Sequence, residues 1–273
     1  YDMTSGDFTN DGKISILGGG NSSTIPFINQ RNTTEFNLNR IYLSLETGNY
    51  SQGFSLADID GDGWKDIVAA RTNEGSVRIF YNNGSTPYFD QNNHQDFIIN
   101  TNKVMNDIRG VATGDVDGDG DMDVAAIRYI QGGSSPNNLL YVLINQNGNL
   151  TVSSTITLPD YSSQWLKMED MNNDGLSDII LAGSSKIKIH NSINGSFNST
   201  PNFSHNFTGA KRLSINDVDA DGFKDIFAIS SNQAIVITQE PQAPTLTVLK
   251  ASNTITSSNV TKTYGDPAFY LSS

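Results

Sequence analysis

Apolar and β-branched residues occur along this chain in short runs that are separated by Gly, Asn, Asp and Ser. The runs return in a fixed order: a short strand, a continuous apolar strand and then a strand with alternating character. The first strands are expected at Gly53–Ala57, Val111–Gly114, Trp165–Glu169 and Arg212–Asn216. The apolar strands are expected at Ile67–Ala70, Val124–Ile127, Ile179–Ala182 and Ile226–Ile229. The third strands are expected at Val77–Tyr81, Leu140–Ile144, Ile187–His190 and Ala234–Thr238. Most units continue into a more polar fourth strand, and no segment shows sustained helical periodicity, so the pattern predicts an all-β fold.

An acidic loop lies between the first and second strand of each unit. Its five versions are DFTNDGKIS from Asp7, DIDGDGWKD from Asp58, DVDGDGDMD from Asp115, DMNNDGLSD from Asp170 and DVDADGFKD from Asp217. Successive loops begin 51, 57, 55 and 47 residues apart. A period near fifty residues is typical of propeller blades, in which four antiparallel strands per unit stack radially. The sequence therefore predicts a β-propeller of four-stranded blades.

The loop itself has the chemistry of a calcium site. Carboxylates at alternate positions direct their oxygens into one concavity, and a glycine at the sixth position permits the sharp turn that closes it. Calcium takes six to eight such oxygen ligands. Without a cation, three or four crowded carboxylates would repel one another and raise one another's pKa values. We therefore expect a protein with several calcium sites.

Composition limits the other functions that the chain could have. The formal net charge is −12, with 29 acidic and 17 basic residues, so nucleic-acid binding is not expected. There is no cysteine, which excludes a disulfide scaffold and Cys-ligated zinc. The longest apolar run, Leu139–Ile144, is far too short to cross a bilayer, so direct membrane insertion is not expected. Loops of this kind need the millimolar calcium found outside cells, which favours an extracellular or cell-surface location. Because the chain begins at Tyr1, within a repeat, we interpret it as part of a longer chain.

The loop and the strand that follows it resemble the FG-GAP/VCBS repeats, the calcium-loop blades that also build the propellers of integrin α-chains. The resemblance covers residues 1–240. It implies side-chain ligands at loop positions 1, 3, 5 and 9 and a backbone carbonyl ligand at position 7. In the four complete loops these are Asp58, Asp60, Asp62, Asp66 and the Trp64 carbonyl; Asp115, Asp117, Asp119, Asp123 and the Asp121 carbonyl; Asp170, Asn172, Asp174, Asp178 and the Leu176 carbonyl; and Asp217, Asp219, Asp221, Asp225 and the Phe223 carbonyl. In the first loop they are Asp7, Thr9, Asp11, Ser15 and the Lys13 carbonyl. Thr9 and Ser15 replace two expected ligands, so four strong calcium sites and one weaker site are expected.

Rival calcium motifs do not fit the pattern. An EF-hand needs a bidentate Glu at the twelfth loop position and a helix on each side. The twelfth residues here are Gly18, Ala69, Ala126, Leu181 and Ala228, and apolar strands follow them. The number of blades stays open between a small five-bladed ring and, as the slightly favoured interpretation, the later part of a larger one.

The composition changes after residue 240. Pro241 and Pro244 indicate a linker, and the string KTYGDPAF looks like the opening of the YGD-type (MBG-type) immunoglobulin-like repeats of very large bacterial surface proteins. Residues 241–273 are therefore expected to be a linker and a short β segment with alternating strand patterns, a partial immunoglobulin-like repeat too short for a complete sandwich.

No catalytic constellation is evident, so the chain is not expected to be an enzyme. His94, His190 and His205 have no metal-ligand spacing and no nucleophile beside them, and we interpret them as structural or surface residues. The expected function is binding or adhesion to a protein or glycan as a calcium-stiffened module. The alternatives are a lectin with sugar pockets between blades and an accessory domain of a secreted polysaccharide-degrading enzyme.

Overall fold

The computed structural model is built from β-strands and turns and contains no helix among the residues that it describes. Those residues are 2–19, 24–26, 28–31, 36–37, 42–44, 53–72, 74–85, 87–99, 107–129, 138–158, 165–239 and 246–251. None of them forms a helix that is long and apolar enough to cross a membrane.

Five four-stranded antiparallel sheets follow one another along the chain. The first contains β1 (Asp2–Gly6), β2 (Ser15–Gly19), β4 (Ile28–Arg31) and β5 (Phe36–Asn37). The second contains β7 (Phe54–Ala57), β8 (Asp66–Arg71), β9 (Ser76–Asn82) and β10 (Phe89–Ile98). The third contains β11 (Asp107–Gly114), β12 (Asp123–Tyr129), β13 (Asn138–Gln146) and β14 (Asn149–Leu158). The fourth contains β15 (Trp165–Glu169), β16 (Asp178–Ala182), β17 (Lys186–His190) and β20 (Phe203–Asn206). The fifth contains β21 (Arg212–Asn216), β22 (Asp225–Ile229), β23 (Ala234–Gln239) and β24 (Leu246–Ala251). Two small hairpin-like pairs, β3 (Thr24–Pro26) with β6 (Tyr42–Ser44) and β18 (Ser192–Ile193) with β19 (Ser196–Phe197), lie between these strands.

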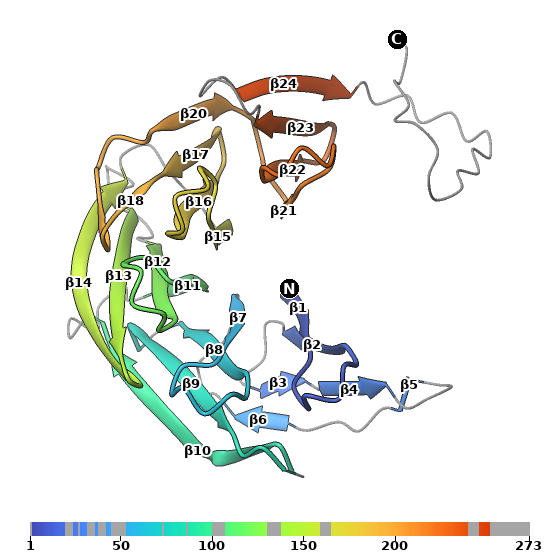
Figure 1. Cartoon of the computed structure of the whole chain (residues 1–273), viewed down its shortest axis with the longest axis vertical. Helices are drawn as coiled ribbons and strands as arrows, with labels where there is room; N and C mark the ends of the chain where they lie inside the picture. The colour runs from blue at the N-terminus through green and yellow to red at the C-terminus, as the bar shows by residue number, and fades with distance from the viewer. Residues whose placement is uncertain are drawn as a thin grey trace.

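The sheets are arranged around an arc, with the first strand of each sheet on the inner side (Figure 1). In each sheet the strands pair in chain order, so each unit is a simple meander. The strands predicted from the hydrophobic pattern are present at the expected places, and the all-β class is confirmed. β24 lies beyond the boundary expected at residue 240 and pairs with β23 from Gln239↔Leu246 to Ala234↔Ala251, so the fifth sheet extends to residue 251. The rest of the expected linker and immunoglobulin-like segment, 241–245 and 252–273, lies outside the described residues.

Four hydrophobic cores hold the arc together, and each is shared by two neighbouring sheets. In β8, Ile67 and Ala69 pack into the core shared with the first sheet, whereas Val68 and Ala70 pack into the core shared with the third. A strand that is buried on both faces needs apolar residues at every position rather than at alternate ones. This requirement explains the continuous apolar runs of the second strands.

The fifth sheet is covered on one face. Val218 and Phe227 are 53% and 42% exposed, whereas the corresponding Val116 and Ala125 of the third sheet are buried against the fourth. The described structure therefore ends at a sheet whose second face is open to solvent.

Candidate calcium loops

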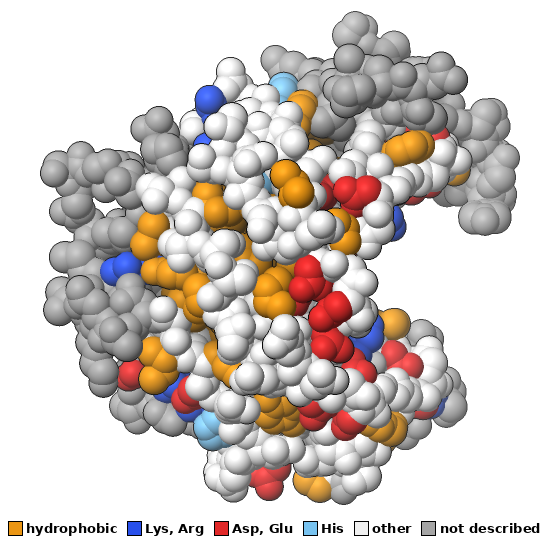
Figure 2. Space-filling model, turned by 60° about the vertical axis from the view of Figure 1, so that its left-hand side comes forward, with side chains coloured by type: hydrophobic (Ala, Val, Ile, Leu, Met, Phe, Trp, Pro, Cys, Tyr) orange, Lys and Arg blue, Asp and Glu red, His pale blue; other side chains and the backbone are white. Residues whose placement is uncertain are grey.

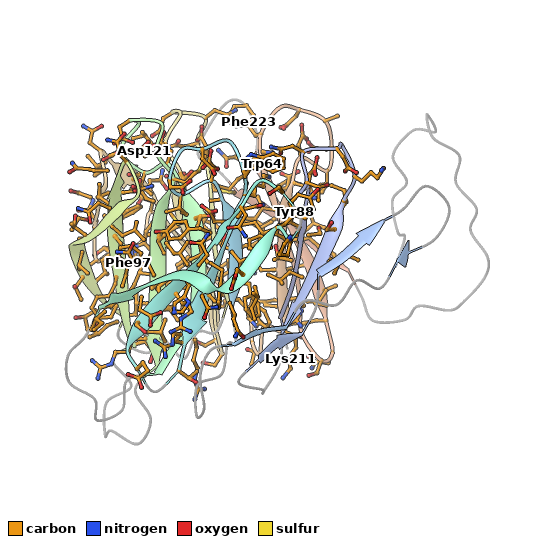
Figure 3. The ribbon with its side chains drawn as sticks, turned by 90° about the horizontal axis from the view of Figure 1, so that it is seen from below. Trp64, Tyr88, Phe97, Asp121, Lys211 and Phe223 are labelled. Atoms are coloured by element: carbon orange, nitrogen blue, oxygen red, sulfur yellow. The ribbon has the colours of Figure 1, made fainter. Side chains whose placement is uncertain are left out.

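The five acidic loops join the first and second strands of their sheets, and they lie along the same edge of the molecule. Asp121, Trp64 and Phe223, from the third, second and fifth loops, are all found at this edge, while Lys211 lies at the opposite one (Figure 3). Acidic side chains gather on one side of the surface (red in Figure 2). The repeats thus carry their acidic loops at a common edge.

All five loops contain the same turn. The first Asp accepts a hydrogen bond on Oδ2 from the amide of the sixth-position glycine, at 2.8–3.0 Å, in every loop. Oδ1 of the fifth-position Asp accepts from the amide of the seventh residue, at 2.8–3.0 Å. The glycines have φ between 79° and 93°, a conformation that L side chains rarely adopt. These bonds shape the loop through the side chains of positions 1 and 5.

Other carboxylate oxygens remain for a cation. In three loops the ligand atoms of three carboxylates lie within 4.8 Å of one another: Asp58, Asp60 and Asp62; Asp115, Asp117 and Asp123; and Asp217, Asp219 and Asp225. Among the described residues, buried Oδ2 of Asp221 has no hydrogen-bond partner. These donor sets consist of oxygen atoms only, which fits calcium, and a cation would satisfy the unpartnered oxygen.

The first and fourth loops differ from these three. The first has two carboxylates, Asp7 and Asp11, and Asp11 also pairs with Lys13 Nζ at 2.9 Å. In the fourth, Asn172 takes the third position and exchanges hydrogen bonds with Asp174, at 3.1 and 2.9 Å. Both loops therefore bring together fewer negative ligand atoms than the other three.

The seventh residues, whose carbonyls the resemblance assigns as ligands, contact neighbouring segments through their side chains. The Trp64 ring lies 6.2 Å from the ring of Tyr88, between centroids. Asp121 Oδ2 accepts a hydrogen bond from the amide of Asn147 at 2.7 Å. Leu176 lies beside Gly118 of the preceding loop. This position therefore contributes packing and turn contacts around the loop.

The ninth-position Asp has a role that the sequence analysis did not assign. Asp66, Asp123, Asp178 and Asp225 are the first residues of the second strands and are completely buried. Oδ2 of each accepts from the amide of the second loop residue, at 2.8–3.0 Å. Oδ1 accepts from an amide at the end of the third strand or directly after it, at 2.8–3.0 Å. This carboxylate therefore attaches the loop to its own sheet.

Burial dominates the acidity of these carboxyl groups. It raises the pKa of Asp66 to about 7 and the pKa values of Asp123 and Asp178 to about 6, although two amides donate to each group. Burial, followed by the negative charge of Asp62, also raises the pKa of Asp60. In the absence of a cation, the loops thus hold their carboxylates against an electrostatic cost.

A second group of residues missed from the sequence ties each loop to the next sheet. Asn82 Nδ2 donates to the Phe8 carbonyl at 2.9 Å, and Asn145 Nδ2 donates to the Ile59 carbonyl at 2.8 Å. Ser192 Oγ donates to the Val116 carbonyl at 2.6 Å. The acceptor in each case is the second residue of the preceding loop. We call these three side chains the junction clamps. A polar residue at the end of an otherwise apolar third strand is the sequence signal that could have indicated them.

Adjacent loops are also in direct contact at two junctions. Asn10 Nδ2 donates to the Gly63 carbonyl at 2.9 Å, and Asn173 Nδ2 donates to the Gly222 carbonyl at 3.1 Å. Both donors occupy loop position 4 with positive φ, which Asn tolerates better than most residues. The loop edge is therefore partly linked from one repeat to the next.

The histidines occupy ordinary structural positions. His190 is buried, its Nδ1 lies 2.9 Å from the Asn198 carbonyl, and burial lowers its pKa. His94 Nδ1 lies 2.7 Å from the Gln91 carbonyl on the surface.

Comparison with known structures gives partial similarity over most of the chain. A lectin from Agrocybe aegerita, described as recognising non-reducing terminal N-acetylglucosamine, is 17% identical with a TM-score of 0.58; the alignment covers 93% of this chain and 66% of the lectin. A rhamnogalacturonan lyase from Bacillus licheniformis is 14% identical with a TM-score of 0.48, over 86% of this chain and 48% of the lyase. The chain thus spans less than two thirds of the length of either protein. No curated protein matches it by sequence.

The model of the FG-GAP-like repeat matches three times, at residues 7–69, 58–126 and 170–228. Each match begins at the first Asp of an acidic loop and ends in the second strand of a sheet. Because these matches together cover more than half of the sequence, the chain belongs to the FG-GAP-like repeat family.

Proposed function

We propose that this chain is a calcium-stabilised segment of an extracellular β-propeller, and that it serves as a non-catalytic binding or adhesion module of a larger protein. The repeated four-stranded meanders, arranged around an arc with their first strands innermost, support the propeller. The FG-GAP-like repeats support the same assignment.

The observation that carries the calcium proposal is the convergence of carboxylate oxygens in the second, third and fifth loops, within 4.8 Å of one another. Their loop backbones are already folded around the first and fifth Asp, so a cation would need little rearrangement of the chain. Bound calcium would neutralise the three crowded carboxylates of each of these clusters and remove their mutual repulsion. Its role is to stiffen the loop edge.

Binding rather than catalysis is proposed because the described carboxylates are used for structure. The ninth-position Asp accepts two backbone amides in each of four loops, and the first Asp closes the turn in all five. A role as an accessory domain of a polysaccharide-degrading enzyme would fit the same arrangement.

For the partner, we favour a glycan over a protein. The similarity of the fold to that of a lectin supports this choice, and so does a specific cavity that is described below. An adhesive contact with a protein is the alternative.

The direct test of the calcium proposal is thermal and chemical unfolding in calcium, in magnesium and after metal removal. A site whose dissociation constant is a hundredfold below the calcium concentration adds about 2.7 kcal/mol to the free energy of unfolding. Several sites should therefore raise the melting temperature strongly. Magnesium is the matched control, because its smaller size and octahedral geometry suit these loops poorly. An unchanged melting temperature after verified metal removal would refute the proposal.

A further inference from the structure

The junction between the fourth and fifth sheets lacks the clamp that closes the other three. Asn82, Asn145, Ser192 and Gln239 occupy equivalent positions, because the amide of each donates to the ninth-position Asp of its own repeat. The side chains of the first three reach the preceding loop. Within the described structure, the Gln239 side chain makes no hydrogen bond to the corresponding carbonyl, that of Met171. Glutamine is one methylene longer than asparagine, so its amide group does not fall at the same place.

The turn after the clamp differs as well. At the two preceding junctions a glycine follows the clamp and packs on the preceding loop: a Cβ on Gly148 would lie 3.4 Å from Asp60, and one on Gly195 would lie 3.2 Å from Asp117. The residues after Gln239 are Glu240, Pro241 and Gln242, which include no glycine. The sequence therefore lacks the residue that allows the close approach seen at the other junctions.

A cavity of about 110 Å³ lies at this unclamped junction. Its apolar lining comes from Met171, Ile189 and Phe203. Its polar lining consists of amides only, from Asn172, Asn191, Asn202 and Gln239. At about 30 Å³ per water molecule, the volume corresponds to three or four waters, which suits part of one ring-sized group rather than a longer oligomer.

The amides have capacity that the protein does not use. Asn202 Oδ1 accepts a hydrogen bond from the backbone N–H of Asn191 at 3.0 Å. Asn202 Nδ2 has no partner among the described residues. The side chains of Asn191 and Gln239 likewise make no hydrogen bond within that part of the chain. An amide both donates and accepts, so it matches the hydroxyl group, which does the same. No charged side chain lines the cavity, so it offers nothing to balance a phosphate or carboxylate.

We infer that this cavity binds one neutral pyranose residue of a glycan. Its hydroxyl groups bond to Asn191, Asn202 and Gln239, and its apolar ring face packs on Phe203. This inference rests on the proposed binding function and assigns it a site and a ligand class. Because Asn172 belongs to the fourth acidic loop and also lines the cavity, that loop forms one wall of the sugar site.

The test is a titration of the protein, in saturating calcium, with the methyl glycosides of N-acetylglucosamine, galactose and rhamnose, followed by NMR of the side-chain amides. We expect at least one glycoside to bind with a millimolar dissociation constant and to shift signals of Asn191, Asn202 or Gln239. Asn191→Ala removes an amide that has no partner in the protein, so it should weaken binding roughly tenfold without lowering the melting temperature. Asn206→Ala, an exposed substitution on β20 away from the cavity lining, is the matched control and should bind as the native chain does.

Gln239→Asn provides an independent variant. It restores the residue that clamps two other junctions, so it should raise the unfolding midpoint while reducing glycoside binding at least as much as Asn191→Ala does. The inference is overturned if none of the glycosides binds at about 20 mM, or if binding is the same in the Asn191→Ala and Gln239→Asn variants as in the native chain. Preferential binding of glucuronate over neutral sugars would overturn it too. Melting of the same samples without calcium tests the proposed calcium role separately, so the two failures can be distinguished.

Discussion

The first and third acidic loops have the same turn but are attached to their sheets in different ways. In both, the first Asp bonds to the sixth-position glycine amide, at 2.8 Å in the first loop and 3.0 Å in the third. At the ninth position the third loop has Asp123, which accepts two backbone amides at 2.8 Å, while the first has Ser15, whose buried Oγ has no partner in the described structure. The comparison separates two tasks: positions 1, 5 and 6 form the turn, and position 9 joins it to the sheet.

The strongest test of this separation is Asp123→Ala, with Ser15→Ala as its matched control. The substitution leaves two buried amides unpaired, each at a cost of about 1–3 kcal/mol, so we expect a loss of about 2–6 kcal/mol in the free energy of unfolding. Ser15→Ala removes no hydrogen bond and should change this free energy very little. Both are measured by urea unfolding with and without calcium. A loss for Asp123→Ala that vanishes in metal-free buffer would show that position 9 acts only as a calcium ligand.

The cation-binding side of the comparison is tested by Asp62→Ala and Asp11→Ala. Asp62 belongs to a cluster of three converging carboxylates, so its removal should abolish binding at a strong site. When the calcium concentration is a hundredfold above the dissociation constant, this lowers the free energy of unfolding by about 2.7 kcal/mol. Asp11 lies in a loop with two carboxylates, so Asp11→Ala should lower the free energy of unfolding by less. Calorimetric titration with calcium should show one strong site fewer in Asp62→Ala. Equal losses of stability in the two variants would contradict the argument from ligand number.

The buried carboxyl groups also predict an unusual response to pH in metal-free protein. Their pKa values in the folded chain, about 7 for Asp66 and about 6 for Asp123 and Asp178, lie above the ordinary value of 3.8. Between these values the folded state binds more protons than the unfolded state, so stability falls as pH rises from about 4 to about 7. Acidification from pH 8 to pH 5 should therefore raise the free energy of unfolding, by about 1–3 kcal/mol for each of the three groups.

In calcium the trend should be reversed, because protons compete with the cation for the same loops. Urea unfolding at the two pH values, with and without calcium, measures both responses. The Asp123→Ala variant should show a smaller pH response in metal-free buffer. A native-like pH response in this variant would remove the buried carboxyl group as its cause.

The smallest expected effect is a gain in stability. Ser15→Asp would give the first loop the carboxylate that the others have, in a position to accept the Phe8 amide as Asp123 accepts that of Val116. The cost of burying the new charge offsets much of the free energy of this hydrogen bond. We therefore expect the free energy of unfolding to rise by about 1 kcal/mol or less, and only in the presence of calcium. Calcium titration should show tighter binding at the weakest site. An unchanged or lower affinity would mean that the first loop differs from the third in more than its ninth residue.

The hydrophobic pattern predicted the strands well because the second strands of the second, third and fourth sheets are buried on two faces, as Ile67 and Val68 show, and therefore have a continuous apolar signal. The loops were predictable because Asp and Gly recur at fixed spacing. The attachment of the loop to its sheet through Asp123 was not predictable, because a buried Asp that accepts two backbone amides has the same sequence pattern as a cation ligand. Asn145 and Gln239 could not be told apart in function either, because one methylene decides whether the side chain reaches the preceding loop. The pairing of β24 with the fifth sheet was not predicted, because prolines precede this strand and the composition changes there.

The cores shared by neighbouring sheets have a consequence for the way the chain folds. Each sheet contributes half of a core, so a single repeat excised from the chain has no complete interior of its own. Stability is then a sum of weak units and strong nearest-neighbour terms, as in solenoid arrays, and nucleation needs two adjacent repeats. The second, third and fourth sheets, each with a neighbour on both sides, are suited to form such a nucleus. The fifth sheet, with Val218 and Phe227 exposed, is covered on one face in the described structure and should exchange its amide hydrogens with solvent before those three sheets do.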